Sequence, residues 1–288
     1  MTSQTILRRN VFSTMAAMFL GALTLQPVSS QVFSDFTGGN SNMLVDAWEG
    51  TPGDGWITSW QTQTNNSTVI DVTTSNANPL VSGGGNYLQF TVTNNHGTAV
   101  RSGKVSRQYE SYGSVNLAQP HTISFEFRMD TAMSAFDRLY FYDSDVSALA
   151  SEAAGTTWLI RGNPNGSLVV HDRENTVTAT GVTLAQGNVY RFTVNVNPSS
   201  VAAESFYTVQ INNLTIPEQS YKSDALRFYS EQTSVGGFLN FTGRVPVGEM
   251  ATFSIDSIHV IPEPSAVAFV SIASLFMLNA RRPLSKTK

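Results

Sequence analysis

The stretch that decides the fold reads Thr122-Ile123-Ser124-Phe125-Glu126-Phe127-Arg128-Met129. Apolar and polar residues alternate at every position. One face of an extended strand would therefore carry Ile, two Phe and Met, and the other would carry Thr, Ser, Glu and Arg. An antiparallel sheet that buries one face against a core requires this pattern. The stretch predicts a strand over residues 122–129.

Similar short alternating runs recur through the central part of the chain. We expect strands at residues 87–92, 139–142, 158–160, 168–170, 190–196, 206–211, 228–229, 238–241 and 253–260. The turn sequence Gly162-Asn163-Pro164-Asn165-Gly166 predicts a hairpin between two of them. Roughly ten to thirteen strands without alternating helices indicate two packed antiparallel sheets. Helical character is confined to residues 146–153, and residues 31–55 are expected to wrap an edge.

Composition excludes several classes of function. The 288 residues include no cysteine, which excludes disulfides, thiolate nucleophiles and cysteine-ligated zinc. Residues 1–30 hold two of the 17 cations, and residues 262–288 hold four more cations and one of the 21 anions. The central segment, residues 31–261, therefore has 11 cations and 20 anions, a net charge of −9. Such a surface repels phosphate backbones, so we expect no nucleic-acid partner.

The N-terminus has the three parts of an export signal. Arg8 and Arg9 precede an apolar run at residues 11–25, and Val28-Ser29-Ser30 offers small residues for signal peptidase. We predict a signal peptide over residues 1–30, cleaved after Ser30. A retained N-terminal membrane helix is the alternative. General secretion fits better than twin-arginine export, because the residues that flank the arginine pair match that pattern poorly.

The C-terminus has a second three-part signal. Pro262-Glu263-Pro264 is followed by an apolar run at residues 265–280 and then by Arg281-Arg282. The prolines fix φ and disfavour helix, so we expect the tripeptide to be extended and exposed beyond the last strand. The apolar run is shorter than the ~20 residues of a permanent span, which favours a transient membrane helix. The cationic end is expected to stay in the cytoplasm.

This tail resembles the PEP-CTERM sorting signal of Gram-negative bacteria. The resemblance implies that an exosortase in the inner membrane recognises the tripeptide and that the tail is removed. It also implies a transient stay in the inner membrane, followed by delivery to the cell surface or extracellular matrix, where many members of the family associate with exopolysaccharide. The implied sorting residues are Pro262, Glu263, Pro264, Arg281 and Arg282. The tail, residues 262–288, would then be separate from the β-domain over residues 31–261.

The order of strands is similar to that of concanavalin A-like jelly rolls. The features that carry this likeness are Gly55-Trp56 and Trp60, the central hairpin, and the closing strand at residues 258–261. The implied fold class is an all-β, two-sheet antiparallel jelly-roll sandwich, flanked by the signal helix and the C-terminal membrane helix.

Catalytic patterns of jelly-roll enzymes are missing from the sequence. No strand carries the Glu-x-Asp-x-x-Glu of glucanases, and Gln210-Ile211-Asn212 lacks the histidine of the Gln-x-His strand of alginate lyases. Glu126 and Asp130 share a strand face, but Arg128 lies between them, which favours a solvated charged face. No Gly-x-Ser-x-Gly sequence occurs. His171, in a run of four polar residues, is read as part of a polar turn.

Two weaker patterns remain as candidate sites. Asp143, Asp145 and Glu152 supply oxygens that Ca²⁺ prefers, although the EF-hand spacing is absent and Asx-turns explain the aspartates equally well. Trp48 and Trp56 lie in glycine-rich sequence and are candidates for stacking on sugar rings. We expect a non-catalytic envelope or matrix protein with weak glycan affinity and no cofactor beyond that candidate calcium. The alternative is a polysaccharide hydrolase or lyase whose catalytic groups come from separate strands.

Overall fold

The chain folds into strands almost throughout the residues that the computed structural model describes. These are residues 32–34, 36, 56–58, 60–64, 68–80, 84–109, 116–145, 155–174, 176–230 and 236–263. They form sixteen strands, two short 3-10 turns, η2 (Met133–Ala135) and η3 (Ala202–Glu204), and no α-helix. Every strand pair is antiparallel. The prediction of an all-β antiparallel fold is confirmed for this part of the chain.

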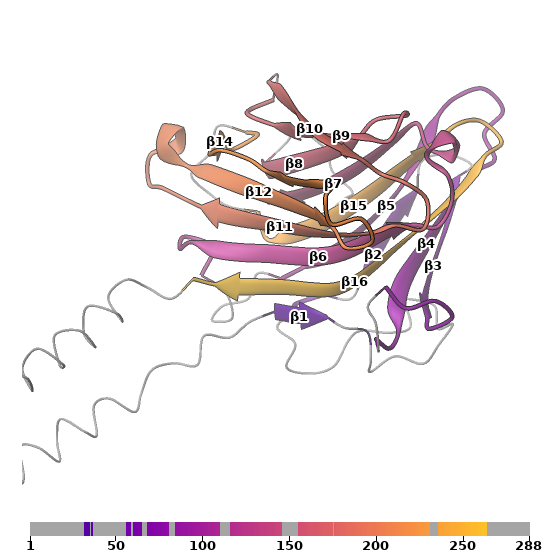
Figure 1. The fold of residues 1–288 in the computed structure, drawn as a ribbon, viewed down its shortest axis with the longest axis horizontal. Helices are drawn as coiled ribbons and strands as arrows, with labels where there is room; N and C mark the ends of the chain where they lie inside the picture. The colour runs from indigo at the N-terminus through magenta and orange to yellow at the C-terminus, as the bar shows by residue number, and fades with distance from the viewer. Residues whose placement is uncertain are drawn as a thin grey trace, which may run out of the picture.

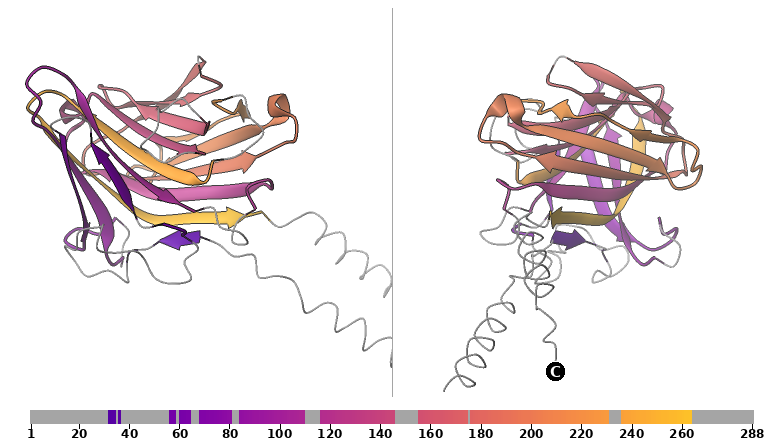
Figure 2. Two further views of the ribbon diagram at one scale, coloured as in Figure 1. Left: turned by 180° about the vertical axis from the view of Figure 1, so that it is seen from behind. Right: turned by 60° about the vertical axis from the view of Figure 1, so that its left-hand side comes forward.

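The strands form two sheets that lie face to face (Figure 1; Figure 2). Sheet A runs in the order β13 (Ser220–Lys222), β12 (Phe206–Asn213), β11 (Val189–Asn197), β6 (His121–Met129), β16 (Met250–Pro262), β4 (Tyr87–Asn94) and β3 (Thr68–Ser75), with β1 (Val32–Ser34) beside β16 and β14 (Leu226–Arg227) beside β12. Sheet B runs in the order β10 (Val177–Thr183), β9 (Ser167–His171), β8 (Thr156–Gly162), β7 (Arg138–Ser144), β15 (Phe238–Val245), β5 (Arg101–Gln108) and β2 (Gln61–Thr64).

Aromatic rings from both sheets fill the space between them. Phe125 of β6 stacks on Phe192 of β11 with ring centroids 5.0 Å apart, and it contacts Phe141 and Phe241 of sheet B at 5.7 and 5.2 Å. Side chains 123, 125, 127 and 129 are all fully buried. The inward face predicted from the alternating stretch is therefore confirmed, and the other face of β6 is the outer face of sheet A.

The polar strands were not foreseen from the sequence. β2, β3, β5, β10 and β13 are rich in Thr, Ser, Gln and Lys, so they lack a strong apolar period. The strand expected at residues 228–229 is wrong, because β14 ends at Arg227. The Tyr229 N–H instead donates to the Thr157 carbonyl at 2.9 Å, which takes the chain from sheet A toward sheet B. A run of two aromatic residues is too short to distinguish a strand from a crossing segment.

β16 holds sheet A together and changes partner along its length. Its first half pairs with β4 and its second half with β1, while β6 runs along its other side from Phe253 to Pro262. Between Asp256 and His259 it has one more residue than β6, and Ser257 has a φ of 49°. This β-bulge shifts the alternation, so Ile255 and Ile258 both face the core although they are three residues apart. Figure 2 shows the bend of this strand.

The sorting tripeptide begins inside the last strand. Pro262 is the final residue of β16 and lies opposite His121, and the Glu263 N–H donates to the Pro120 carbonyl at 2.9 Å. The expectation that the tripeptide starts beyond the last strand is therefore wrong for Pro262. A proline is tolerated here because it is the last residue of the strand, where its missing N–H does not break the cross-strand hydrogen bonds in the interior of the ladder. Glu263 is exposed as expected.

Several predicted segments lie outside the described residues. They are the signal peptide, the helical segment at residues 146–153, Pro264 and the apolar tail with Arg281 and Arg282. Among the described residues there is no helix with the length and apolar character that crossing a membrane requires. From residues 31–55 the structure describes β1 and Phe36, and β1 pairs with the end of β16, as an edge-wrapping segment would.

Candidate binding site on the outer face of sheet A

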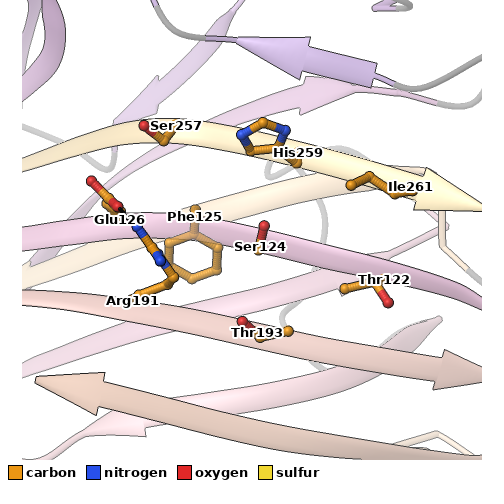
Figure 3. A pocket seen from close by; sticks show the side chains of 9 residues that line it. All are labelled: Thr122, Ser124, Phe125, Glu126, Arg191, Thr193, Ser257, His259 and Ile261. Atoms are coloured by element: carbon orange, nitrogen blue, oxygen red, sulfur yellow. Dashed lines mark hydrogen bonds and ion pairs between the residues drawn. The ribbon is translucent and has the colours of Figure 1, made fainter. Parts of the chain in front are cut away.

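A pocket of 410 Å³ lies on the outer face of sheet A, across three neighbouring strands (Figure 3). Strand β6 forms its middle, β16 one side and β11 the other. The lining residues are Thr122, Ser124, Phe125, Glu126, Arg191, Thr193, Ser257, His259 and Ile261. Apart from Phe125 and Ile261, every one of them carries a polar side chain.

The register of the three strands explains why the surface is hollow. Ser124 lies between His259 and Thr193, so the middle row has a small side chain at its centre. One adjoining row has Glu126 beside Arg191, and the other has Thr122 beside Ile261. Small residues in the centre and longer ones around them leave a depression that is rimmed by polar groups. Figure 3 shows this arrangement, with the Arg191 side chain extended toward Glu126.

Glu126 and Arg191 form the ion pair at one end of the pocket. The Nη2 and Nε atoms of Arg191 donate to Glu126 Oε1 at 2.5 and 3.2 Å. The Glu126 side chain is 1% exposed, whereas that of Arg191 is 49% exposed. Glu126 Oε2 is buried and has no hydrogen-bond partner among the described residues. The pair therefore presents one unused carboxylate oxygen beneath a partly exposed guanidinium group.

The bulge in β16 shapes the same end of the pocket. Ser257 adopts a left-handed conformation that is uncommon outside glycine, and its N–H donates to the Asp256 carboxylate at 2.7 Å. Asp256 lies opposite Glu126 and is 2% exposed, so two carboxylates occupy neighbouring positions on adjacent strands. Bulges with strained residues are concentrated at functional sites, although strain alone identifies none.

The charged residues predicted on β6 are only partly brought together. The Arg128 Nε donates to Asp130 Oδ1 at 2.6 Å, while Glu126 pairs with Arg191 from the next strand. Asp130 also accepts hydrogen bonds from Gln89 and Ser254, so its carboxylate is fully engaged. The predicted solvated face is wrong for Glu126 and Arg128, which are buried, and only Asp130, at 18%, is partly exposed.

Of the two aromatic candidates, the structure describes Trp56 alone. Trp56 is half-buried, with the Arg107 guanidinium 4.6 Å from its ring centroid and the ring of Trp60 5.9 Å away. One face of Trp56 is therefore covered by Arg107, which is itself buried. Trp48 lies outside the described residues. Trp56 does not line the pocket, and Trp60 and Trp158 belong to the core.

The candidate calcium ligands do not form a described cluster. Asp143 is fully buried among the inward residues of sheet B, Asp145 is exposed, and Glu152 lies outside the described residues. Burial raises the pKa of Asp143 well above its usual value, although the nearby Tyr109 and Thr157 hydroxyls lower it in part. Neither carboxylate oxygen completes a hydrogen bond with a described residue. Within the described ranges no three His, Asp or Glu side chains converge as metal ligands do.

His171 is a buried, neutral histidine at the end of β9. Its ring lies 5.3 Å from Tyr229, and burial, followed by the nearby Arg161 charge, lowers its pKa to about 4. Asp172 beside it accepts from both Arg227 Nε and Nη2 at 3.0 and 3.1 Å, which lowers the pKa of that carboxyl. Residues 172–174 form the predicted turn, in which Asp172 pairs with Arg227 of β14, whereas His171 belongs to strand β9 and is buried.

Comparison with known proteins yields similarities of fold only. No family model matches the chain, and no curated protein matches it. A sialidase matches at 11% identity and a TM-score of 0.48, over 89% of this chain and 21% of the sialidase, so the chain spans about a fifth of that protein. The PL-14 alginate lyase from Aplysia kurodai matches at 8% identity and a TM-score of 0.47, over 70% of this chain and 90% of the lyase. Lectin II from Ulex europaeus matches at 13% identity and a TM-score of 0.40, over 71% of this chain and 98% of the lectin.

The pocket was missed in the sequence because it combines three distant segments. Its central strand was identified correctly, and residues 124 and 126 were placed on the outer face. Arg191 and His259 are 65 and 135 positions along the chain from Glu126 and Ser124, and nothing in the local sequence pairs them. The one available signal was the pair of Ile residues three positions apart in the closing strand, which a regular alternation does not allow.

Proposed function

We propose that this chain is an exported envelope or matrix protein whose sandwich, a concanavalin A-like jelly roll, binds polysaccharide in the pocket on sheet A. The observation that carries the binding proposal is the pocket itself. It has a volume of 410 Å³, and most of its lining consists of hydroxyl groups and an ion pair. Sites for small polar ligands are concave and use a few convergent polar groups to fix orientation.

The delivery part of the proposal rests on the two terminal signals in the sequence. The last described backbone hydrogen bond of the domain is made by Glu263, the second residue of the sorting tripeptide. Only Pro264 separates that residue from the apolar run. An exosortase would therefore act at the boundary of the folded domain, next to the strand pair β6–β16.

Mass spectrometry tests the delivery proposal. The mature protein should be isolated from the envelope of a host that has an exosortase, and again from the same host without it. We expect the N-terminus to be residue 31 in both hosts. The C-terminal tail should be lost only in the host that has the exosortase. Retention of Lys288 in most of the envelope protein of the first host would refute the sorting assignment.

Affinity measurements test the binding proposal. The full chain, purified in detergent, should be titrated with a panel of neutral and acidic oligosaccharides by calorimetry, with and without Ca²⁺. We expect saturable binding to at least one of them. Binding that requires Ca²⁺ would indicate a calcium site, for which Asp143 and Asp145 are the candidate ligands. No binding to any oligosaccharide in the panel would refute the role of the pocket.

One observation favours an enzyme as the second candidate. Glu126 and Asp256 are cross-strand neighbours, and such residues have Cα atoms about 4.5–5.5 Å apart. Two nearby carboxylates are the minimum equipment of a glycoside hydrolase. Against this, the Glu126 carboxylate is engaged by Arg191, and the Asp256 carboxylate accepts a backbone N–H. We expect no release of reducing ends or unsaturated uronates, and turnover that disappears in Glu126→Gln would establish the enzyme instead.

A further inference from the structure

The unused oxygen of Glu126 bears on which sugars the pocket accepts. Oε1 accepts both hydrogen bonds from Arg191, and Oε2 is buried without a described partner. A buried acceptor that is left unpaired costs about 1–3 kcal/mol, and more when it is charged. A ligand that brings a hydroxyl donor to Oε2 removes that cost, whereas a ligand that brings an acceptor there does not.

The charge at this end of the pocket points the same way. The positive charge of Arg191 is already matched by Glu126 at 2.5 Å. An anionic ligand in the pocket would therefore meet the Glu126 carboxylate and a guanidinium group whose charge is already matched. Like charges a few ångströms apart are strongly disfavoured where burial excludes solvent.

The rest of the pocket suits a neutral, hydroxyl-rich ligand. Arg191 is about half exposed, and its remaining N–H groups can donate to a ring or hydroxyl oxygen beside the Glu126 carboxylate. Ser124 and Thr193 add hydroxyls on the middle row, which can both donate and accept. Ile261, which is 41% exposed, offers an apolar contact at the other end.

We propose that the pocket accepts a neutral sugar residue, with one hydroxyl donating to Glu126 Oε2 and a neighbouring oxygen accepting from Arg191, and that it rejects uronate and sulfated sugars. This specificity rests on the proposed function, because it assumes that the pocket binds polysaccharide. It assigns Glu126 the role of selecting the ligand by charge.

The test compares neutral and acidic ligands of equal length. The full chain in detergent is titrated at pH 8, where histidine side chains ordinarily carry no charge, with neutral gluco-, manno- and galacto-tetrasaccharides. The acidic probes are tetragalacturonate and tetramannuronate. We expect the best neutral ligand to bind at least ten-fold more tightly than either uronate.

Two variants and a control isolate the carboxylate. Glu126→Gln keeps the shape but leaves Arg191 unmatched, so the affinity for the neutral ligand should fall about ten-fold while uronate affinity rises. Arg191→Gln should weaken uronate binding further. Glu218→Gln, at an exposed position, should change neither. Urea unfolding of each variant shows whether a lost affinity reflects a lost fold, and Arg191→Gln retains the test if Glu126→Gln does not fold.

The outcomes separate this inference from the proposed function. Binding to none of the probes refutes both. Uronate binding by the unmodified chain that equals or exceeds neutral binding refutes the specificity alone. So does a preference for neutral sugars that is unchanged in both variants. A preference that narrows in Glu126→Gln and widens in Arg191→Gln supports the inference.

Discussion

Truncating Phe125 to alanine tests whether the two sheets pack as described. The ring is 0% exposed and lies between the sheets, 5.0 Å from Phe192, 5.2 Å from Phe241 and 5.7 Å from Phe141. Replacing a buried Phe by Ala typically costs about 3–5 kcal/mol of unfolding free energy. We expect the upper part of that range, because residues in both sheets surround the ring and cannot close on the cavity without moving a strand.

A double-mutant cycle makes the argument specific. Phe192→Ala should cost a similar amount, because this ring is also fully buried and stacks on Phe125 with an interplanar angle of 11°. The two losses should not add, and the coupling should be about 0.5–1.5 kcal/mol, as for other aromatic pairs. Phe206→Ala is the matched control. Its ring is 38% exposed at the start of β12, so we expect a loss of less than about 1 kcal/mol.

Urea unfolding of the full chain in detergent, followed by tryptophan fluorescence, measures these differences. The midpoint should fall strongly for Phe125→Ala and Phe192→Ala and barely change for Phe206→Ala. Losses below about 1 kcal/mol for both core variants would mean that the inward faces of β6 and β11 are assigned wrongly. The same result would place Glu126 and Arg191 in the core and remove the pocket.

Two further predictions follow from buried ionisable groups. Burial raises the pKa of Asp143 well above its usual 3.8. As pH rises above 3.8 the unfolded chain releases a proton that the folded chain still holds, so the free energy of unfolding falls. Asp143→Asn should therefore raise the urea midpoint at pH 7 and leave it unchanged near pH 3.5. If the variant instead has a lower midpoint than the unmodified chain at pH 7 in the presence of Ca²⁺, Asp143 is a metal ligand. The pKa of His171 is lowered from 6.5 to about 4, so between these values the unfolded chain takes up a proton that the folded chain does not. The free energy of unfolding should fall as pH decreases through this window, by about 1–2 kcal/mol once solvent screening is allowed for. His171→Gln should reduce that pH dependence, which is measured by comparing urea midpoints at pH 7 and pH 4.5. Equal pH dependence in the two chains would contradict the assignment.

Local alternation was enough to predict the apolar strands. The strands predicted at residues 122–129, 190–196 and 206–211 are confirmed, because one face of each is almost entirely apolar. β5 was not, because its inward positions include Gly103 and Arg107. A Cβ at Gly103 would approach the Val92 methyl groups to 2.9 Å, so a close approach between strands requires glycine there. The need for glycine at this position comes from a contact with the opposite sheet, and such contacts leave no alternating pattern in the sequence of the strand itself.

The candidate site was less predictable than the fold. The sequence places Glu126 on the outer face, where the nearest cation along the same strand is Arg128, two residues away. The structure pairs it with Arg191 instead, since residues directly opposite on neighbouring strands are closer than residues two apart on one strand. Strand order decides which residues are opposite, and strand order depends on long-range packing that one sequence does not display.

Filling the pocket tests the central claim most directly. Ser124→Leu places a larger apolar side chain at the centre of the pocket floor, between His259 and Thr193, without touching the core. The matched control is Thr178→Leu, at an exposed position on β10 of the other sheet. Calorimetric titration with the tightest-binding oligosaccharide should show at least a ten-fold loss of affinity for Ser124→Leu and none for Thr178→Leu, with equal urea midpoints. Equal affinities in Ser124→Leu and the unmodified chain would contradict the account and show that any glycan binds elsewhere.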